Sequence, residues 1–486
     1  MNKISCFLPY AGKEQVEKTV NSLQATGLIE EIRLITTDAT LESLPDCEIL
    51  FVDMPYSSAT LKAIANAAKG EYTLLYTKET TLEMGMFALE RMIHILEDSS
   101  AGMVYADHYQ IADGKQSNAP VIDYQFGSLR DDFNFGSLLL FNTEKLKEAA
   151  GHMKSDYNFA GLYDLRLKLS QHSNLVHINE YLYIEVENDT RKSGEKIFDY
   201  VDPKNRDRQI EMEQACTEHL KEIGGYLAPE FKKIEFSAGN FEYEASVIIP
   251  VRNRIRTIRD AIKSVLMQKT DFKYNLIIID NHSTDGTTEA IDEFKDDERL
   301  IHIVPERNDL GIGGCWNVGV HHPKCGKFAV QLDSDDVYKD ENTLAIMVRA
   351  FYEQNCAMVV GTYMMTDFNM NMIAPGIIDH KEWTPANGRN NALRINGLGA
   401  PRAFYTPVLR EVKVPNTSYG EDYALGLNFS RQYQIGRVYD VVYLCRRWDD
   451  NSDASLDIVK MNGHNLYKDR IRTWELQARI AMNKNK

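Results

Sequence analysis

The chain has 486 residues, which at roughly 150 residues per domain suggests about three units, or two large ones and a connector. Hydrophobic residues make up 43% and charged residues 26%, which excludes a collagen-like, coiled-coil or wholly disordered chain. The net charge of −16 argues against generic nucleic-acid binding. No apolar run reaches the roughly 18 residues of a membrane span, and the cysteines form no CxxC pair. We therefore expect a soluble cytoplasmic protein with reduced thiols and no nucleic-acid partner.

Two parts of the chain begin in the same way. Residues 4–9 and 245–250 each form an apolar strand that ends in proline, at Pro9 and Pro250, and each strand is followed by a helical segment and a second apolar strand. Short strands that alternate with amphipathic helices predict an α/β fold with a mostly parallel sheet.

The similarity returns further along both parts. Y-D-L-R-L-K-L-S at 163–170 matches Y-A-L-G-L-N-F-S at 423–430, and a tyrosine follows thirteen residues after each final serine, at Tyr183 and Tyr443. We interpret this as an internal duplication. The alternative, two unrelated α/β domains that share helix periodicity, explains the leucines but not the shared register.

A charged stretch separates the two copies. It opens with N-D-T-R-K-S-G and then predicts a helix from Pro203, a favourable first-turn residue, to about Ile223. The sequence therefore predicts a first domain at 1–190, a helical connector at 191–243 and a second domain at 244–486 that ends in a basic helix.

Three carboxylates follow the third apolar strand of the second copy. Asp333, Asp335 and Asp336 repel one another unless a cation lies among them, and hard divalent ions prefer oxygen ligands. An EF-hand is excluded, because its required loop glycine is replaced by Tyr338. The acids would serve equally well as the cap of the helix that follows, so this segment leaves both alternatives open.

Two more polar segments follow apolar strands. I-I-I-D-N-H-S-T-D-G-T places Asp280 and Asn281 where open α/β sheets bind ligands, although a turn rich in Asx and Ser is the favoured explanation of this segment by itself. N-D-L-G-I-G-G-C-W-N-V-G, which includes Asn317, resembles a Gly-rich phosphate loop. It lacks G-x-G-x-x-G, because Trp316 stands at the third glycine position, and it has no G-K-[ST]. A dinucleotide site is therefore not favoured.

Five motifs between residues 245 and 450 occur in the order found in the inverting family 2 glycosyltransferases of GT-A fold, and the chain resembles that family. They are A-S-V-I-I-P-V-R-N, I-I-I-D-N-H-S-T-D-G-T, N-D-L-G-I-G-G-C-W-N-V-G, Q-L-D-S-D-D and Y-G-E-D-Y-A-L. The resemblance implies two tandem GT-A domains, Rossmann-like with a mostly parallel central sheet. It also implies a nucleotide-sugar donor, with a UDP-sugar preferred over a GDP- or dTDP-sugar.

The D-x-D position of the family falls on Asp333 and Asp335. The resemblance implies that Asp333 holds the donor ribose and that both carboxylates form the site of a Mn²⁺ or Mg²⁺ ion at the diphosphate. Asn281 stands where relatives often carry Asp, and Arg252 where they often carry an aromatic residue, so a uridine donor is less secure. The full set of expected donor-binding residues is Pro250, Arg252, Asp280, Asn281, Asn308, Asn317, Asp333, Arg446 and Arg447.

The family's general base falls on Asp422, with Glu421 beside it. A sugar hydroxyl is a poor nucleophile, so a carboxylate must take its proton, a contribution of about 10²–10⁴-fold. The alternative is that both acids only favour the dipole of a helix N-terminus.

Arg446 and Arg447 suit a diphosphate, and Trp448 suits a sugar ring of the acceptor. A surface cluster is the alternative. Processive relatives carry a glutamine where this chain has Leu444, so processive synthesis is not supported.

The first copy has lost these groups. The positions of the acid cluster, the base pair and the arginine pair carry T-K-E-T, G-L and V-E, at residues 77–80, 161–162 and 186–187. We interpret it as a degenerate, non-catalytic copy that binds acceptor, scaffolds the second domain or mediates assembly. The alternative is a second transferase with different chemistry, which would make the chain a bifunctional glycan synthase.

Residues 460–486 are rich in Lys and Arg, and Tyr467, Ile471, Trp474 and Ala478 recur at helical spacing. Such a helix can rest on the inner face of an anionic membrane, which would suit a lipid-linked acceptor. Packing of the stripe on its own domain is the favoured alternative.

The sequence therefore predicts a metal-dependent inverting glycosyltransferase that moves a single sugar to a glycan or lipid-linked saccharide acceptor. A non-catalytic nucleotide-sugar-binding protein is the alternative from another class. A nucleotidyltransferase also uses a strand-end acid cluster, but no basic Gly-rich loop follows the first strand.

Overall fold

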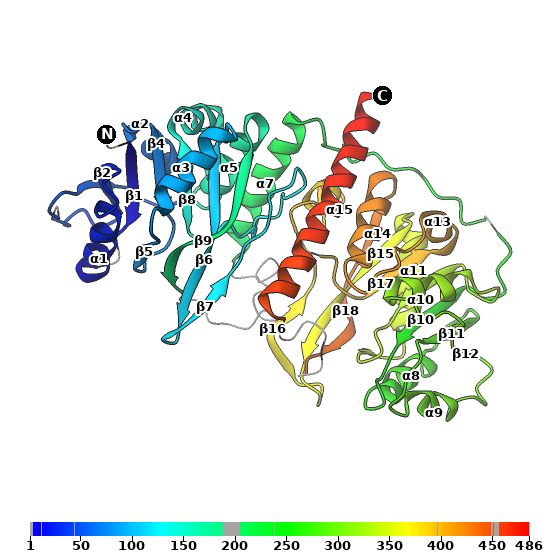
Figure 1. Cartoon of the computed structure of the whole chain (residues 1–486). Helices are drawn as coiled ribbons and strands as arrows, with labels where there is room; N and C mark the ends of the chain where they lie inside the picture. The colour runs from blue at the N-terminus through cyan, green and yellow to red at the C-terminus, as the bar shows by residue number, and fades with distance from the viewer. Residues whose placement is uncertain are drawn as a thin grey trace. The chain divides into compact units, whose positions relative to one another are not determined.

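The computed structural model describes residues 3–10, 12–42, 44–187, 205–237, 239–395, 397–448, 451 and 456–485 (Figure 1). The chain divides into two compact units. Unit 1 comprises Met1–Lys192, Asn205–Tyr226 and Leu456–Ile480, and unit 2 comprises Ser193–Lys204, Leu227–Ser455 and Ala481–Lys486.

Unit 1 contains a nine-stranded sheet in the order β3-β2-β1-β4-β8-β6-β9-β5, with β7 beside β6. Its strands are β1 (Ile4–Pro9), β2 (Ile29–Thr36), β3 (Glu48–Phe51), β4 (Tyr72–Tyr76), β5 (Leu82–Met84), β6 (Met103–Ala112), β7 (Lys115–Ala119), β8 (Leu138–Asn142) and β9 (Leu175–Val186). Its helices are α1 (Lys13–Gln24), α2 (Ser58–Ala67), α3 (Ala88–Asp98), α4 (Thr143–His152), α5 (Gly161–His172), α7 (Arg206–Glu222) and most of α15 (Ile458–Lys484).

Unit 2 contains a second nine-stranded sheet, in the order β12-β11-β10-β13-β17-β15-β18-β14, with β16 beside β15. Its strands are β10 (Ala245–Val251), β11 (Tyr274–Asp280), β12 (Leu300–Ile303), β13 (Phe328–Gln331), β14 (Val337–Tyr338), β15 (Met358–Thr366), β16 (Met372–Ile378), β17 (Arg402–Tyr405) and β18 (Ile435–Arg446). Its helices are α8 (Ile258–Leu266), α9 (Thr287–Asp292), α10 (Ile312–His321), α11 (Thr343–Gln354), α12 (Gly388–Asn391), α13 (Thr406–Val412) and α14 (Glu421–Gln432).

The expected α/β fold class is confirmed, and both sheets are mixed with mostly parallel strands. In unit 2, β10 pairs in parallel with β11 and β13, whereas β17 runs antiparallel to β13 and β15. The residues of β11 are all buried, as expected for a central strand covered on both faces. Because the carboxyl ends of β10, β11 and β13 meet at one edge, the polar segments that follow these strands lie along that edge.

The two sheets have the same strand order, and their pairing registers correspond. Ile4 lies opposite Tyr72 in unit 1, and Ala245 lies opposite Phe328 in unit 2. When β1 is aligned with β10 from these residues, residues 77–80 fall on the positions of 333–336. This correspondence supports the tandem layout, while a common origin of the two copies stays a hypothesis.

The helix expected in the connector is present as α7, but it belongs to unit 1. Pro203 and the N-D-T-R-K-S-G segment lie outside the described residues. The carboxylate of Glu211 in α7 accepts the backbone N–H groups of Phe159 (2.6 Å) and Ala160 (3.1 Å) just before α5. These bonds explain why the helix packs with the first domain.

The C-terminal helix α15 also groups with unit 1 up to residue 480, whereas the sequence placed it with the second domain. The carboxylate of Asp469 accepts the hydroxyl of Ser128 at 2.9 Å, and the hydroxyl of Thr473 accepts the N–H of Gly127 at 2.9 Å. Polar contacts between residues more than three hundred positions apart set this grouping, so local composition gave no sign of it.

The buried face of α15 differs from the predicted apolar stripe. Ile471 is buried, but Trp474 is 56% exposed, and charged residues such as Asp469 and Arg472 are fully buried instead. Among the described residues, no helix combines the length and the apolar character that crossing a bilayer requires. Contact of residues 460–486 with a membrane surface therefore stays a prediction.

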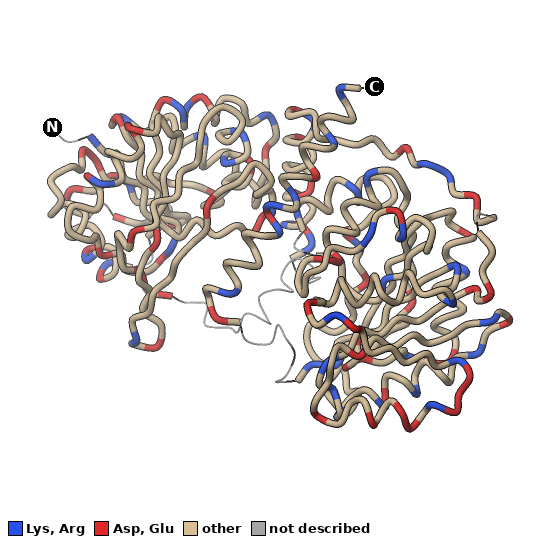
Figure 2. Tube along the Cα trace, turned by 45° about the vertical axis from the view of Figure 1, so that its right-hand side comes forward, with Lys and Arg blue, Asp and Glu red and all other residues tan. Residues whose placement is uncertain are grey.

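Acidic and basic side chains are interspersed along both units (Figure 2). All seven cysteines lie within the described residues, and none of them forms a disulfide there. Burial raises the pKa of Cys315 to about 11, which makes this thiol a poor nucleophile.

Candidate active site

The acid cluster lies in the loop between β13 and β14 of unit 2. Gln331 Nε2 donates to Asp333 Oδ1 at 2.8 Å, and the N–H of Asp333 donates to the hydroxyl of Tyr443 at 3.2 Å. Asp336 is only 4% exposed and accepts the backbone N–H of Arg446 at 2.8 Å. Strand β18 therefore holds both ends of the acid loop, through Tyr443 and Arg446.

Asp422 lies in the first turn of α14 and is held by an arginine. Arg402 Nη1, on β17, donates to Asp422 Oδ2 at 2.8 Å, and the N–H of Tyr423 donates to Asp422 Oδ1 at 2.7 Å. The Asp422 side chain remains 29% exposed, so a substrate hydroxyl can reach it. A partly exposed carboxylate with a fixed orientation suits a general base.

Glu421 has a different environment from its neighbour. Burial raises the pKa of Glu421 to about 8, the charge of Asp422 adds to the rise, and Arg402 opposes it. The Glu421 Oε2 atom is buried with no hydrogen-bond partner among the described residues. Near neutral pH Glu421 is therefore protonated, while Arg402 holds the neighbouring Asp422 side chain in place.

The acid loop and the start of α14 share one electrostatic neighbourhood. Burial raises the pKa of Asp333, and the charges of Asp335 and Asp422 raise it further, while Arg402 lowers it. The structure thus brings together Asp333 and Asp422, which lie 89 positions apart in the sequence, around the guanidinium of Arg402.

Asp335 is the second expected metal ligand. Its Oδ2 accepts Asn451 Nδ2 at 3.2 Å and Trp448 Nε1 at 3.5 Å, and Arg254 Nε lies 3.9 Å away. Among the described residues, no three His, Cys, Asp or Glu side chains form a group able to hold a metal ion. Magnesium sites often use only one or two protein carboxylates and complete their shell with substrate phosphates and water. Asp333 and Asp335 fit such a site, because both offer hard oxygen donors.

Asp280 at the end of β11 and Asn281 after it differ in whether a side-chain oxygen remains to accept a hydrogen bond from a ligand. Asp280 is fully buried and accepts the Thr288 hydroxyl at 2.5 Å and the Ser283 N–H at 3.0 Å. Burial raises the pKa of Asp280, but hydrogen bonds from His302, Thr288 and Ser283 outweigh burial and hold the pKa well below its usual value. Asn281 Nδ2 donates to the carbonyl of Leu310 at 2.8 Å, and the buried Asn281 Oδ1 has no partner among the described residues. Of the two, Asn281 retains an acceptor for a ligand.

The remaining expected donor residues around β10 and α10 differ in position. Pro250 is half-buried in β10, and Arg252 and Asn308 are exposed. The amide of Asn317 accepts the N–H of Val414 at 3.0 Å and donates to the carbonyl of Val414 at 2.7 Å. Asn317 therefore ties α10 to the segment after α13, which differs from the expected donor contact.

Arg446 is fully buried, and its guanidinium links α8 to the acid loop. Arg446 Nη1 pairs with Asp260 Oδ2 at 2.9 Å, and Arg446 Nε donates to the carbonyl of Asp335 at 2.5 Å. This differs from an open diphosphate clamp, since the side chain fixes the acid loop. Arg447 is half-buried, and its backbone N–H donates to Thr366 O at 2.8 Å.

Trp448, the expected acceptor residue, lies beside the acid loop. Its indole packs against Phe368 with ring centroids 5.6 Å apart, and the guanidinium of Arg256 lies 4.9 Å from its ring centroid. Trp448 thus adjoins Asp335.

Sequence reasoning missed four residues of this site: Arg254, Arg256, Arg402 and Asn451. The V-R-N-R-I-R segment carried a signal, because its arginines alternate after β10 and only Arg252 was selected. No sequence signal pointed to Arg402, because it lies on β17 outside any recognised motif.

Comparisons with known proteins relate the sequence of this chain to glycosyltransferases. The family model Glycosyl transferase family 2 matches residues 246–403. An uncharacterized glycosyltransferase of Rickettsia felis is 28% identical over 198 residues, which cover 40% of this chain and 31% of that protein. Glycosyltransferase GlyG of Streptococcus pneumoniae is 27% identical over 122 residues, 25% of this chain and 40% of that protein. The chain spans less than half the length of these relatives.

Among solved structures, S. aureus TarS 1–349 in complex with UDP-GlcNAc is similar with a TM-score of 0.37 and 18% identity, covering 49% of this chain and 72% of that one. The family match includes the acid loop and ends before Glu421 and Asp422. The match to the Glycosyl transferase family 2 model therefore lies in unit 2 and includes the acid cluster of Asp333 and Asp335.

Proposed function

We propose that unit 2 is a metal-dependent inverting glycosyltransferase that moves a single sugar from a nucleotide-diphosphate sugar to a saccharide or lipid-linked acceptor. The observation that carries the proposal is the convergence of Asp333 and Asp422 on Arg402, within the same unit as the family 2 match. Direct displacement at a sugar carbon needs a carboxylate that takes the proton of the acceptor hydroxyl and groups that hold the donor. In unit 2 Asp422 and Asp333 would fill these two roles, and both interact with Arg402.

In this proposal Asp422 is the general base. Its carboxylate takes the proton of the acceptor hydroxyl as that oxygen attacks the anomeric carbon, and the bond to the nucleoside diphosphate breaks on the opposite face. Arg402 orients the carboxylate through its 2.8 Å hydrogen bond. Glu421, uncharged near neutral pH, keeps a second negative charge away from the attacking oxygen.

Asp333 and Asp335 would hold the donor end of the site. Asp333 would bind the ribose, and both carboxylates would hold a Mn²⁺ or Mg²⁺ ion. Such an ion, when bound, stabilises the charge that develops on the departing diphosphate. The unpartnered Asn281 Oδ1 can accept a hydrogen bond from a base N–H, which uracil, thymine and guanine all offer, so the preference for a UDP-sugar stays a prediction.

Two other functions remain as alternatives. A bifunctional synthase would need chemistry in unit 1, where Thr77 and Leu162 occupy the positions of Asp333 and Asp422. A non-catalytic nucleotide-sugar-binding protein would bind the donor without turnover. The carboxylate set of unit 2 favours transfer over both.

The test is donor turnover by the full chain with Asp422→Asn. Release of nucleoside diphosphate is followed from UDP-glucose, UDP-N-acetylglucosamine, GDP-mannose and dTDP-glucose, each with Mn²⁺ or with EDTA. We expect the wild type to release one diphosphate only with metal, and Asp422→Asn to bind that nucleotide normally but release it at least about 10²-fold more slowly.

The control is Asp440→Asn, which changes an exposed aspartate of β18 and should keep the wild-type rate. Equal rates for Asp422→Asn and wild type would remove Asp422 from the mechanism. Nucleotide binding by the wild type without any turnover would favour the non-catalytic alternative.

A further inference from the structure

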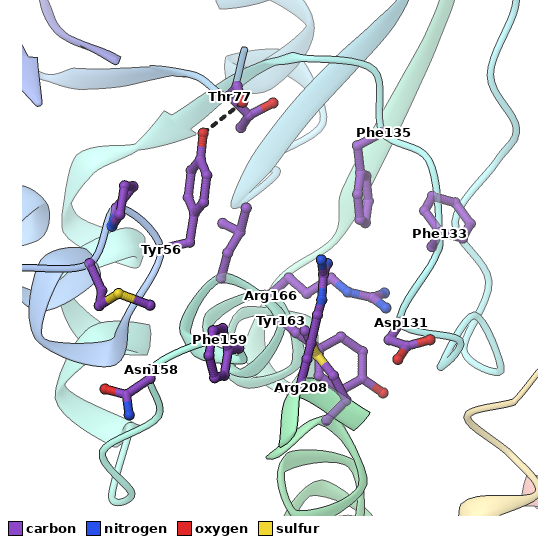
Figure 3. Close-up of a pocket in the computed structure, with 14 residues that line it drawn as sticks. Tyr56, Thr77, Asp131, Phe133, Phe135, Asn158, Phe159, Tyr163, Arg166 and Arg208 are labelled. Carbon is purple, nitrogen blue, oxygen red and sulfur yellow. Dashed lines mark hydrogen bonds between the residues drawn. The ribbon is translucent and has the colours of Figure 1, made fainter. Parts of the chain in front are cut away.

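Unit 1 contains a cavity of about 330 Å³, a volume within the usual range for small-molecule sites. Its walls come from the segment after β3, the end of β4, the loop before β8, the start of α5 and the connector helix α7. Figure 3 shows Tyr56 and Phe159 on one side of the view, Phe133 and Phe135 on the other, and the side chains of Arg166 and Arg208 between them.

The cavity lies where the second unit has its candidate active site. Thr77 and Leu162 line the cavity, and the shared strand register and the equal lengths of α5 and α14 place them at the positions of Asp333 and Asp422. The carboxylates are therefore replaced by a hydroxyl and an aliphatic side chain at the same edge of the fold. Such a cavity can bind a ligand but cannot take a proton from it in the same way.

The lining combines aromatic faces with polar groups. The guanidinium of Arg166 lies 4.7 Å from the ring centroid of Tyr163 and 5.4 Å from that of Phe135. Arg208 and Asp131 add a second guanidinium and a carboxylate to the walls. Aromatic faces suit the C–H faces of a sugar ring, while guanidinium and carboxylate groups suit its hydroxyls.

The walls are held in place before any ligand binds. The Tyr56 hydroxyl donates to Thr77 O at 2.6 Å, and the Tyr163 hydroxyl donates to Leu129 O at 2.5 Å. Arg166 donates to Ser128 O at 2.9 Å and to Arg130 O at 2.5 Å. Fixed walls reduce the conformational entropy that the protein loses when a ligand binds, so this is a preorganised site.

The connector helix completes the cavity. Arg208 and Met212 of α7 line it, and between them Glu211 fixes the backbone that presents Phe159. Phe159 lines the cavity and is 40% exposed, so part of its ring is accessible to a ligand.

We infer that this cavity is a non-catalytic saccharide-binding site, in which Phe159 stacks on a sugar ring and Arg208 and Asp131 bind its hydroxyls. Saccharide binding here does not require transfer by unit 2. Only the identification of this saccharide as part of the acceptor rests on the proposed function.

The inference is tested by saturation-transfer NMR and calorimetry on the full chain, with glucose, N-acetylglucosamine, galactose, glucuronic acid and their β-linked disaccharides as probes. We expect at least one probe to bind the wild type and Phe159→Ala to bind it about 10-fold more weakly, the loss of one aromatic contact. Phe126→Ala, which changes a 45% exposed phenylalanine of unit 1 outside the cavity, should bind as the wild type does.

The outcomes separate this inference from the proposed function. No binding of any probe at about millimolar concentration, or binding that Phe159→Ala leaves unchanged, would overturn the saccharide site whatever the donor turnover. Displacement of the probe by UDP alone would also overturn it, because the cavity would then be a nucleotide site. If the wild type shows no donor turnover, the proposed function is rejected, and the result on saccharide binding is unaffected.

Discussion

At the scale of single residues, the carboxyl groups Glu421 and Asp422 are adjacent in sequence but lie in different environments. Burial raises the pKa of Glu421 to about 8, whereas the Asp422 side chain is 29% exposed and accepts a hydrogen bond from Arg402. Glu421 is therefore protonated near neutral pH.

This difference predicts how stability depends on pH. Between the ordinary value of 4.5 and the folded pKa of about 8, the folded protein holds more protons at Glu421 than the unfolded chain does. The free energy of unfolding therefore falls as pH rises through this interval. Glu421→Gln should remove that part of the fall, measured by urea unfolding between about pH 5 and pH 9.

Glu411→Gln, at an exposed position of α13, is the matched control and should keep the wild-type dependence. If Glu421→Gln also keeps it, the Glu421 carboxyl is not protonated in the folded state. A fall in donor turnover above about pH 8 that Glu421→Gln abolishes would link the same proton to catalysis.

At the scale of elements, two corresponding segments carry opposite charges in the two units. They are the loop after β4 or β13 and the end of β9 or β18. In unit 2 the loop after β13 is acidic, and the end of β18 supplies Arg446. In unit 1 the loop after β4 supplies Lys78, which pairs with Glu185 at 2.5 Å and with Glu187 at 3.3 Å near the end of β9. In unit 1 a side-chain ion pair therefore ties this loop to the end of β9, whereas in unit 2 Arg446 Nε ties it to the end of β18 through the backbone carbonyl of Asp335.

We predict that Lys78→Ala destabilises unit 1 by about 1–3 kcal/mol, because it leaves a buried carboxylate without its cation. Glu185 is only 2% exposed. Burial raises the pKa of Glu185, but His108 and Lys78 outweigh burial and lower it overall. Stability from this group is present above the ordinary pKa and is lost as pH falls, so Lys78→Ala should also weaken the acid sensitivity of unfolding.

The control for that prediction is a surface ion pair of the same unit. Lys62 and Asp156 lie 3.5 Å apart with side chains 34% and 89% exposed, and Lys62→Ala should cost about 0–1 kcal/mol in urea unfolding. A loss for Lys78→Ala no larger than for Lys62→Ala would show that the buried pair adds nothing to stability.

At the scale of the whole molecule, the shared strand order allows the same position to be changed in each unit. Asp335 and Glu79 occupy equivalent places after β13 and β4. Asp335→Ala should abolish the stabilisation of the protein by Mn²⁺ with nucleoside diphosphate in a melting experiment, because a metal ligand is lost. Glu79→Ala should leave both this stabilisation and donor turnover within about two-fold of the wild type.

Unchanged melting behaviour of Asp335→Ala would reject its role as a metal ligand. A large loss of turnover in Glu79→Ala would instead support the bifunctional alternative, in which unit 1 carries chemistry of its own.

Local sequence determined the strands, several helices and the shared register of this protein. The strand predicted at 4–9 is β1, and the strand predicted at 245–250 is β10 with one residue more. Tyr183 and Tyr443 lie at equivalent positions of β9 and β18. These features follow from runs of apolar residues and from turn chemistry, which act over short distances along the chain.

Tertiary structure alone decided which distant side chains meet. It placed Arg402 against Asp422, buried Arg446 against the acid loop, grouped α15 with unit 1 and formed the cavity that α7 closes. Contacts of this kind depend on the packing of elements that are far apart in sequence, and a buried charge is tolerated only where such packing supplies a partner. No local pattern encodes that partner, which is why the sequence suggested Asp333 and Asp422 as site residues but not Arg402, which interacts with both.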